Sequence, residues 1–335
     1  MNELNFGMKV RQALNEGVRA DAGISPRVAE RLLARGDEVC VLDNFNDFYD
    51  PARKRKNIAS FLGQPGYTLV EGDIRDEALV ESLFATRKFD AVIHLAARAG
   101  VRPSLSEPIL YEDVNCIGTL RLLEAARRHG PQIFLFGSSS SVYGINRKVP
   151  FAEDDEVNQP ISPYATTKRT GELLCYNYHH LHGLKIACLR FFTVYGPAQR
   201  PEMAIHKFTD LMARGRAIPM YGDGESRRDY TFVDDIVDGI LSIWSSGETM
   251  SVYHIGTMEE VSISHLAALI AKAMRAEISF SSGPAADGGT PRRCPDISKL
   301  AKLGYVPAIP LSEGIDRTVN WYRSNPQPID VNTLL

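Results

Sequence analysis

Between Pro26 and about residue 192, short apolar runs alternate with segments of helical pattern, and this alternation limits the possible folds more than any other feature. Runs typical of strands buried on both faces occur at 38–43, 68–73, 89–97, 132–140 and 184–192. Helical patterns lie between them, most clearly at 26–35, 113–129 and 164–182. Repetition of strand, helix and strand at this spacing predicts an α/β fold with a right-handed, doubly wound parallel sheet.

After about residue 193 the alternation becomes irregular, and glycine, proline and arginine accumulate at 221–228 and 281–295. We expect this region to form a smaller α/β lobe over the carboxyl ends of the strands, where such sheets bind ligands. The predicted division places the nucleotide-binding domain at 1–185, with a returning segment at about 229–258 that packs on it. The substrate lobe then comprises 186–228 and 259–335.

Composition narrows the class of protein. The 335 residues are 44% hydrophobic and 24% charged, which excludes a disordered chain, a collagen-like fibre and a disulfide scaffold. With 38 basic and 41 acidic residues, the formal charge of −3 gives no overall attraction to nucleic acid or to an anionic membrane. No apolar run approaches the roughly 18 residues of a membrane span, and the first residues are too polar for a secretory signal.

The cysteines indicate a reducing compartment. They are odd in number, lie far apart and form no CxxC pair, so we expect buried free thiols in a cytoplasmic protein. The five are Cys40, Cys116, Cys175, Cys188 and Cys294.

The residues that end the first clear strand are suited to a dinucleotide. Asp43 closes the run at 38–43, and Asn44 follows it. A carboxylate in this place can accept both ribose hydroxyls and would repel a 2′-phosphate, so it favours NAD over NADP. Taken alone, Asp43 could equally be a turn residue.

Two further strand ends fit the same ligand. Asp73 and Ile74 close the next strand and could flank an adenine ring. Ala96 and Ala97 are small residues at a strand end, where a flat ring could pass. Packing of a helix against the sheet explains the two alanines as well, and only the rest of the pattern favours the cofactor.

The glycine-rich turn that normally opens such a domain is missing. Glycines in this turn let the backbone approach the pyrophosphate at a helix N-terminus. Counted back from the helix, the three glycine positions fall on Arg19, Ala22 and Ser25, and the nearby Gly23 is out of phase. The preceding RQALNEGV lacks a β-branched run, so we do not expect it to form a buried strand. Side chains at all three positions would crowd the pyrophosphate, which counts against NAD binding.

A Tyr-x-x-x-Lys pattern carries the strongest signal for chemistry. Pro163 can occupy the first turn of a helix, which places Tyr164 and Lys168 one turn apart on one face. An ammonium group beside a phenol favours the phenolate, and a phenolate is a usable general base. The strand upstream ends in four serines at 138–141, whose hydroxyls could relay a proton. The alternative is a serine-rich turn followed by a surface helix.

Other polar groups are less specific. The three histidines at 179–182 could ligate a metal, but cations are favoured at a helix C-terminus in any case, so we predict no metal site. His94 lies in an apolar run and is expected to be a hydrogen-bonded core residue. Arg227 and Arg228 can bind an anion bidentately or form a solvated basic turn.

Taken together, six segments resemble the extended short-chain dehydrogenase/reductase family, and most closely its UDP-glucuronate 4-epimerases. The resemblance runs from about Val28 to the end of the chain. It rests on LDNFNDFYDP (42–51), HLAARAGVRPS (94–104), SSSSVYG (138–144), SPYATTK (162–168), RFFTVYGPAQRPEMAIHKF (190–208) and RRDYTFVDDI (227–236).

The resemblance implies a Rossmann-like domain, bound NAD, a UDP-sugar substrate and a homodimer. It assigns catalysis to Tyr164 and Lys168, with Ser139 as their hydroxyl partner. It places Asn115 on the nicotinamide side of the cofactor. It assigns substrate binding to Thr193 and to Arg228, which would bind the phosphates. Because the resemblance begins abruptly, we hypothesise a shifted reading frame or a mis-assigned start over roughly the first 27 residues, which sequencing of the coding DNA would test.

The implied reaction is inversion at C4 of a UDP-sugar through a 4-keto intermediate, with UDP-glucuronate and UDP-galacturonate as the expected pair. Related dehydratases and decarboxylases carry carboxylates just after the catalytic Ser/Thr, whereas this chain has Ser140 and Ser141, which favours epimerisation. A UDP-glucose 4-epimerase or another NAD-dependent epimerase/dehydratase is the alternative within the class. A non-catalytic nucleotide-sugar binder is the alternative outside it, because the glycine turn is absent.

A hexuronate differs from the neutral sugar by a carboxylate at C6, so a dedicated enzyme should present a cation there. Arg102 and Arg200 both follow predicted strands at their carboxyl ends. Either arginine could instead pair with a nearby acid, Glu107 or Glu202.

Overall fold

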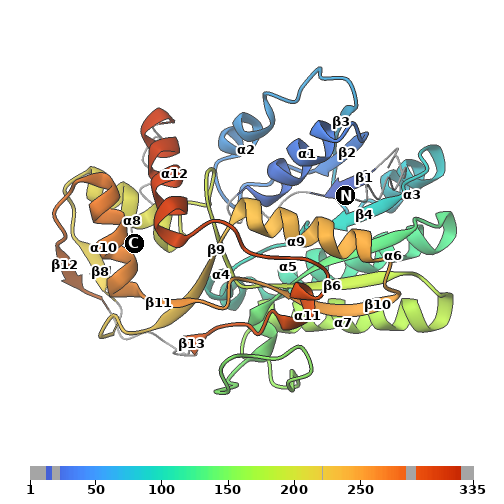
Figure 1. The fold of residues 1–335 in the computed structure, drawn as a ribbon. Coiled ribbons are helices and arrows are strands. Elements are labelled where there is room, and N and C mark those ends of the chain that lie inside the picture. Colours follow the sequence, from blue (N-terminus) through green and yellow to red (C-terminus); the bar gives the residue numbers. More distant parts are fainter. Residues whose placement is uncertain (1–12, 17–22, 221, 284–291, 326–335) are drawn as a thin grey trace, which may run out of the picture.

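A seven-stranded sheet in which every neighbouring pair is parallel forms the centre of the molecule (Figure 1). The computed structural model describes residues 13–16, 23–220, 222–283 and 292–325. The strand order is β10-β6-β5-β4-β1-β2-β3. The strands are β1 (Ala13–Glu16), β2 (Val39–Asp43), β3 (Tyr67–Glu71), β4 (Ala91–His94), β5 (Ile133–Ser139), β6 (Ile186–Phe191) and β10 (Met250–Ile255).

Helices cover both faces of this sheet, because successive side chains of a strand point to opposite faces. Val41 and Ile93 belong to the core under α1 (Ile24–Ala34) and α9 (Val233–Ser246). Leu42 and Val92 belong to the core under the opposite helices. Those helices are α3 (Glu77–Thr86), α6 (Gly118–His129) and α7 (Pro163–His182). The predicted doubly wound α/β fold is confirmed.

Short elements carry the chain between the strands at the carboxyl edge of the sheet. They are α2 (Pro51–Ile58), α4 (Val101–Ser106), α5 (Pro108–Glu112), the π-helical turn η1 (Asp113–Ile117) and the 3₁₀ turn η2 (Ser140–Tyr143).

A smaller lobe follows β6 and lies on the left of Figure 1. Its sheet pairs β9 (Arg227–Phe232) with β7 (Thr193–Tyr195), β11 (Glu260–Ser262) and β13 (Arg292–Arg293), and β8 (Ile218–Met220) pairs with β12 (Phe280–Ser282). Its helices are α8 (Ala204–Ala213), α10 (Ile263–Met274) and α12 (Leu311–Ser324). Between β9 and β11 the chain returns to the large sheet, where α9 packs on α1 and β10 pairs with β6. Beside β10 lies α11 (Ser298–Ala301).

One prediction about local structure was wrong, and a second was confirmed with a difference in detail. The stretch RQALNEGV does contain a strand, since β1 pairs with β2 on one side and β4 on the other. Backbone hydrogen bonds from both neighbours make this strand, and they do not require β-branched residues. The helix predicted at 113–129 begins as a π-helical turn before it becomes α6.

Among the described residues, no helix combines the length and hydropathy that a membrane crossing requires. All five cysteines are buried free thiols, as predicted.

Candidate active site

The carboxyl end of β5 and the first turns of α7 bring the predicted catalytic residues to one region. Ser162 caps α7 by accepting a hydrogen bond from Ala165 N (3.1 Å), and Pro163 follows as the first helical residue. This start places Tyr164 and Lys168 one turn apart, as predicted. Ser139 is the last residue of β5, against which α7 packs. Ser139, Tyr164 and Lys168 are all buried.

Lys168 is fixed before any ligand binds. Its side chain is 1% exposed, and Nζ donates a hydrogen bond to the carbonyl of Gly137 (2.7 Å). The ammonium group also lies 5.1 Å from the centroid of the Phe136 ring. Close packing allows this reach, because a Cβ at Gly171 of α7 would stand only 2.2 Å from Cζ of Phe136.

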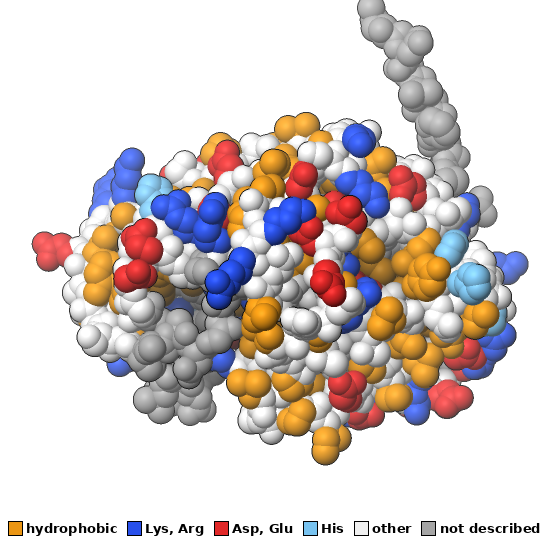
Figure 2. All heavy atoms as spheres, turned by 90° about the horizontal axis from the view of Figure 1, so that it is seen from below, with side chains coloured by type: hydrophobic (Ala, Val, Ile, Leu, Met, Phe, Trp, Pro, Cys, Tyr) orange, Lys and Arg blue, Asp and Glu red, His pale blue; other side chains and the backbone are white. Residues whose placement is uncertain are grey.

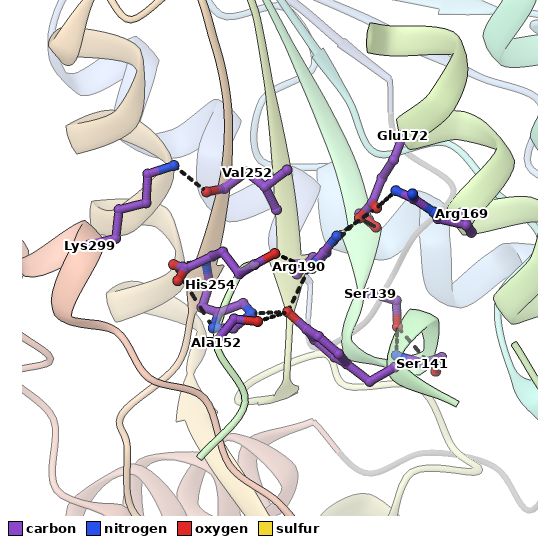
Figure 3. A network of polar contacts seen from close by, with 12 residues as sticks. Ser139, Ser141, Ala152, Arg169, Glu172, Arg190, Val252, His254 and Lys299 are labelled. Carbon is purple, nitrogen blue, oxygen red and sulfur yellow. Dashed lines mark hydrogen bonds and ion pairs between the residues drawn. The ribbon is translucent and has the colours of Figure 1, made fainter. Parts of the chain in front are cut away.

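The hydroxyl of Ser139 is held by the turn that follows it. Its Oγ accepts a hydrogen bond from Ser141 N and lies 3.2 Å from Ser141 Oγ, an arrangement visible in Figure 3. From the smaller lobe, Arg293 Nη1 donates to Ser141 Oγ over 3.5 Å. The serine turn therefore joins the end of β5 to the lobe that covers it.

The ring of Tyr164 packs edge-on against Tyr111, with centroids 6.3 Å apart. The hydroxyl of Tyr111 donates to Ala99 O (2.6 Å), so the partner ring is itself anchored to the loop after β4. These contacts orient the Tyr164 ring.

A buried ion pair joins α7 to β6 (Figure 3). Glu172 of α7 accepts two bonds from Arg190 of β6, at 2.8 and 2.9 Å, and both side chains are almost fully buried. Glu172 also accepts from Ser138 Oγ (2.6 Å) and Arg169 Nη1 (3.1 Å). Burial alone would raise the pKa of Glu172, but the bonds and charge of Arg190 keep that pKa below its usual value.

The same arginine continues the network into the loop after η2. Arg190 Nη1 donates to the hydroxyl of Tyr143 (2.6 Å), and that hydroxyl donates to Ala152 O (2.8 Å). His254 of β10 contacts the same hydroxyl through Nε2. The network therefore links β5, β6, β10 and α7.

A pocket at the ends of β2, β3 and β4 gathers the six residues predicted to hold the adenosine part of a dinucleotide. Its lining includes Asp43, Asn44, Asp73, Ile74, Ala96 and Ala97, together with Arg75 and Arg98.

The carboxylates of this pocket differ in their electrostatic environment. Burial raises the pKa of Asp43 to about 6, against the opposing bond from Phe45 N (2.7 Å) and the charge of Lys54. Burial would also raise the pKa of Asp73, but bonds from Arg75 and Asn44 outweigh it and lower that pKa to about 2. Asp73 is therefore an ionised residue in the pocket lining. Asp43 is a buried hydrogen-bond acceptor that suits two ribose hydroxyls.

Asn115 lies in the π-helical turn and is buried. Its Oδ1 accepts from Arg98 N (2.7 Å), and its Nδ2 donates to Arg98 O (3.0 Å) and to Thr167 Oγ1 (2.9 Å). The side chain thus ties the loop after β4 to α7, next to Lys168.

The predicted phosphate-binding arginine has a partner that the sequence analysis missed. Arg228 of β9 pairs in register with Arg293 of β13. Burial lowers the pKa of Arg293 to about 10, and the charge of Arg228 adds to the decrease. Two close guanidinium groups suit a diphosphate. Only the spatial pairing of β13 with β9 reveals Arg293, because the two residues are far apart in sequence.

The other substrate candidates fall in different environments. Arg200 is 5% exposed, and its Nη1 donates to Glu202 Oε1 (2.6 Å), which is the acidic pairing named above as the alternative. Arg102 is exposed on α4. Thr193 begins β7, where it pairs with Tyr230 of β9.

Of the three missing glycine positions, Arg19 and Ala22 lie outside the described residues. Ser25 is buried in the first turn of α1. The helix begins after Gly23, whose φ is +65° and where a Cβ would stand 3.2 Å from Pro197 O. Within the described ranges, no group of three or more His, Cys, Asp and Glu residues could hold a metal ion. His94 is buried and contacts Thr119 Oγ1 (2.9 Å) through Nε2.

Comparison with known sequences settles the family. Residues 24–256 match the NAD dependent epimerase/dehydratase family over more than half of the chain. The chain belongs to this epimerase/dehydratase family. The UDP-glucuronate 4-epimerase of Thermodesulfobacterium geofontis is 38% identical to it over 305 residues, which cover 89% of this chain and 93% of the relative.

Solved structures agree with this family. The UDP-glucuronic acid 4-epimerase from Bacillus cereus, in complex with UDP-glucuronic acid and NAD, matches with a TM-score of 0.87 and 30% identity. The match covers 93% of this chain and 99% of that one. DesIV from Streptomyces venezuelae, a dTDP-glucose 4,6-dehydratase with NAD and TYD bound, matches with a TM-score of 0.86 and 31% identity, over 94% and 97%. This epimerase-family chain is therefore similar to both an epimerase and a dehydratase in fold.

Proposed function

We propose that this chain interconverts UDP-glucuronate and UDP-galacturonate by NAD-dependent epimerisation at C4. The observation that carries the proposal is the convergence of Tyr164, Lys168 and Ser139 at the end of β5, beside a pocket that suits adenosine. The relatives named UDP-glucuronate 4-epimerase support the choice of sugar.

Each residue has a separate task. Tyr164, as phenolate, takes the proton of the 4-hydroxyl, and Ser139 relays it. Lys168 stabilises the phenolate and is already held in place by Gly137 O. Asp43 would hold the adenosine ribose, with Ala96 and Ala97 beside the ring system. Bound NAD would supply an acceptor, and later a donor, for the hydride of C4.

The remaining assignments concern the substrate and the nicotinamide side. Arg228, together with Arg293, would bind the diphosphate of the UDP group. Thr193 would contact the sugar. Arg200 and Arg102 are the candidates for the C6 carboxylate, and Asn115 would face the nicotinamide side while it supports Arg98.

Elimination is disfavoured by the serine turn. Expulsion of a leaving group at C6 needs a carboxylate near the catalytic hydroxyl, and the positions after Ser139 are Ser140 and Ser141. Both are buried in η2, where they supply hydroxyls only. This distinguishes the chain from a dehydratase of the same fold.

The test is incubation of the purified chain with NAD and UDP-glucuronate in D2O, followed by chromatography and NMR of the nucleotide sugars. We expect UDP-galacturonate without deuterium at C4 or C5, because the hydride is returned within the pocket. Deuterium at C5 would indicate exchange of the C5 proton beside the 4-keto group or loss of CO2, and conversion of UDP-glucose but not of UDP-glucuronate in a parallel incubation would indicate the neutral-sugar epimerase. Absence of turnover together with retained UDP-sugar binding would indicate the non-catalytic binder.

A homodimer is the expected assembly, formed through the outer face of α7. Leu173, Tyr176 and Leu181 are exposed there, at spacings that place them on one side of the helix. The ring of Tyr176 stacks on His180, with centroids 6.2 Å apart. Figure 2 views the molecule from the side on which α7 lies and shows hydrophobic side chains on that face among charged ones. An apolar helix face supports association with a second copy.

A further inference from the structure

Two arginine side chains from different parts of the chain lie near the same aromatic ring, that of Phe48. Phe48 lies in the loop after β2, and the guanidinium carbons of Arg98 and Arg200 stand 5.7 and 5.5 Å from the centroid of its ring. Arg98 belongs to the loop after β4, and Arg200 to the loop after β7 of the smaller lobe. Three loops at the carboxyl edge of the sheet therefore meet at Phe48.

Neighbouring residues contact the Phe48 ring and hold the backbone of Arg98. Gly100 adopts φ +99°, and a Cβ built there would already approach Phe48 Cζ to 3.9 Å and Pro103 Cδ to 3.2 Å. The backbone of Arg98 is bonded on both its N–H and its C=O by Asn115. Asn115 therefore fixes the point from which the Arg98 side chain extends toward Phe48.

The charges of Arg98 and Arg200 influence Tyr111, which packs on the predicted general base Tyr164. Burial raises the pKa of Tyr111 to about 12, and the charges of Arg200 and Arg98 oppose the rise. The Tyr111 ring packs on that of Tyr164. On the other side, Arg98 lines the adenosine pocket with Asp43.

Two guanidinium groups on one ring repel each other, and an oxyanion between them removes that repulsion while it accepts charge-assisted hydrogen bonds. Glu202 bonds to Arg200, but its side chain is 38% exposed, whereas that of Arg200 is 5% exposed. Water therefore weakens this ion pair on the side of the acid.

We infer that Phe48, Arg98 and Arg200 form a clip for an oxyanion, in which the ring sets the spacing of the two guanidinium groups. The inference rests on the proposed function, because that function brings two oxyanions to this edge: the C6 carboxylate of the sugar and the pyrophosphate of the cofactor. Arg98 and Arg200 bind the anion, and Phe48 is a positioning residue.

The experiment uses Arg98→Gln, Phe48→Leu and Phe48→Tyr in the full chain, with the exposed Arg216→Gln as the matched control. Dissociation constants for UDP-glucuronate, UDP-glucose and NAD are measured by calorimetry, and thermal unfolding is followed for each variant. We expect Arg98→Gln to weaken one of the anions about ten- to a hundredfold. Phe48→Leu should weaken the same anion about five- to thirtyfold, and Phe48→Tyr should restore it.

The ligand whose binding is weakened shows whether the clip holds the C6 carboxylate of the sugar or the pyrophosphate of the cofactor. A loss confined to UDP-glucuronate identifies the sugar carboxylate, and a loss confined to NAD identifies the pyrophosphate. Unchanged binding of all three ligands, or an equal loss for all three with lower thermal stability, overturns the inference. Because the readout is binding, the clip can hold even if the wild-type chain fails to epimerise UDP-glucuronate, so failure of the proposed function is recognised separately.

Discussion

The ring of Tyr164 contacts that of Tyr111 edge-on, and phenylalanine keeps this ring. Tyr164→Phe should therefore preserve the fold and the binding of UDP-sugars while it removes the general base. We expect kcat to fall about 100- to 10,000-fold. Steady-state kinetics and calorimetric binding of UDP-glucuronate check both halves, and activity within tenfold of wild type would place the base elsewhere.

Asp43 is predicted to lower the free energy of unfolding at neutral pH and to contribute to NAD binding. Folded, it keeps its proton to about pH 6, against an ordinary value of 3.8, so the folded chain binds more protons between these limits. Its unfavourable contribution therefore grows as the pH rises from about 4 to 6 and is complete above that window. Asp43→Asn should raise the free energy of unfolding at pH 7.5 by about 1–3 kcal/mol and weaken NAD binding.

Denaturant titrations of the ligand-free chain at pH 4.5 and 7.5 measure the first effect, and NAD fluorescence titration measures the second. The stability gap between Asp43→Asn and wild type should be larger at the higher pH. A gap that is the same at both values, or NAD binding as tight as in wild type, would contradict the assigned role.

Arg200 and Arg102 provide the test of sugar choice. A charge-assisted arginine–carboxylate contact corresponds to about a ten- to hundredfold loss of kcat/KM when it is removed. We expect that loss for UDP-glucuronate in Arg200→Ala or Arg102→Ala, with little change for UDP-glucose, which has no carboxylate. Parallel kinetics on the two sugars decide between them, because equal losses would assign these arginines to the support of the fold.

The placement of Tyr164 and Lys168 on one helix face follows from the helix start, which the structure has as predicted. Ser139 is selected among four serines by the family resemblance, and the catalytic roles of all three residues stay predictions. Arg293 and Phe48 do not follow from the sequence, because their importance comes from neighbours that only the folded chain brings close, namely Arg228 and the pair Arg98 and Arg200.

At the scale of elements, Glu172 joins α7 to β5 and β6 through Ser138 and Arg190. Glu172→Ala leaves a buried guanidinium uncompensated, which should cost about 3–5 kcal/mol of folding stability. Glu313→Ala, in the exposed pair with Arg317 on α12, is the matched control and should cost less than about 1 kcal/mol. Urea denaturation compares the two, and similar costs would show that the network is not a structural link.

Prediction of elements succeeds where burial on both faces produces long apolar runs, as for β2, β5 and β6. It fails for β1, whose stability in the sheet comes from pairing with β2 and β4. It also misses the π-helical turn, in which Asn115 faces both Arg98 and Thr167. In both cases the deciding interactions come from residues distant in sequence, and a local sequence pattern does not reveal such contacts.

At the scale of the whole molecule, the chain leaves the large sheet after β6, builds part of the smaller lobe and returns as α9 and β10. This path agrees with a smaller lobe interrupted by a returning segment, but β6 (Ile186–Phe191) pairs with β5 and β10 in the large sheet, so the proposed boundary after residue 185 moves to the end of β6. Because the chain passes from one region to the other more than once, we expect the two regions to fold as one unit.

The proposed homodimer is tested on α7. Tyr176→Glu places a charge on the exposed apolar face, and we expect it to convert an assembly of two 37.1 kDa chains into a monomer. Leu62→Glu, an exposed leucine away from α7, is the control. Light scattering coupled to size-exclusion chromatography gives the masses. A wild-type monomer, or a variant that stays dimeric, would reject this face as the interface.

The bond between Lys168 Nζ and Gly137 O has a consequence for how a ligand is received. A free lysine side chain loses about 1.5–2 kcal/mol of rotamer entropy when it is immobilised. Here that loss occurs during folding, so an arriving cofactor or sugar meets an ammonium group that is already ordered. Association should therefore be limited by diffusion and desolvation rather than by a search among side-chain conformations.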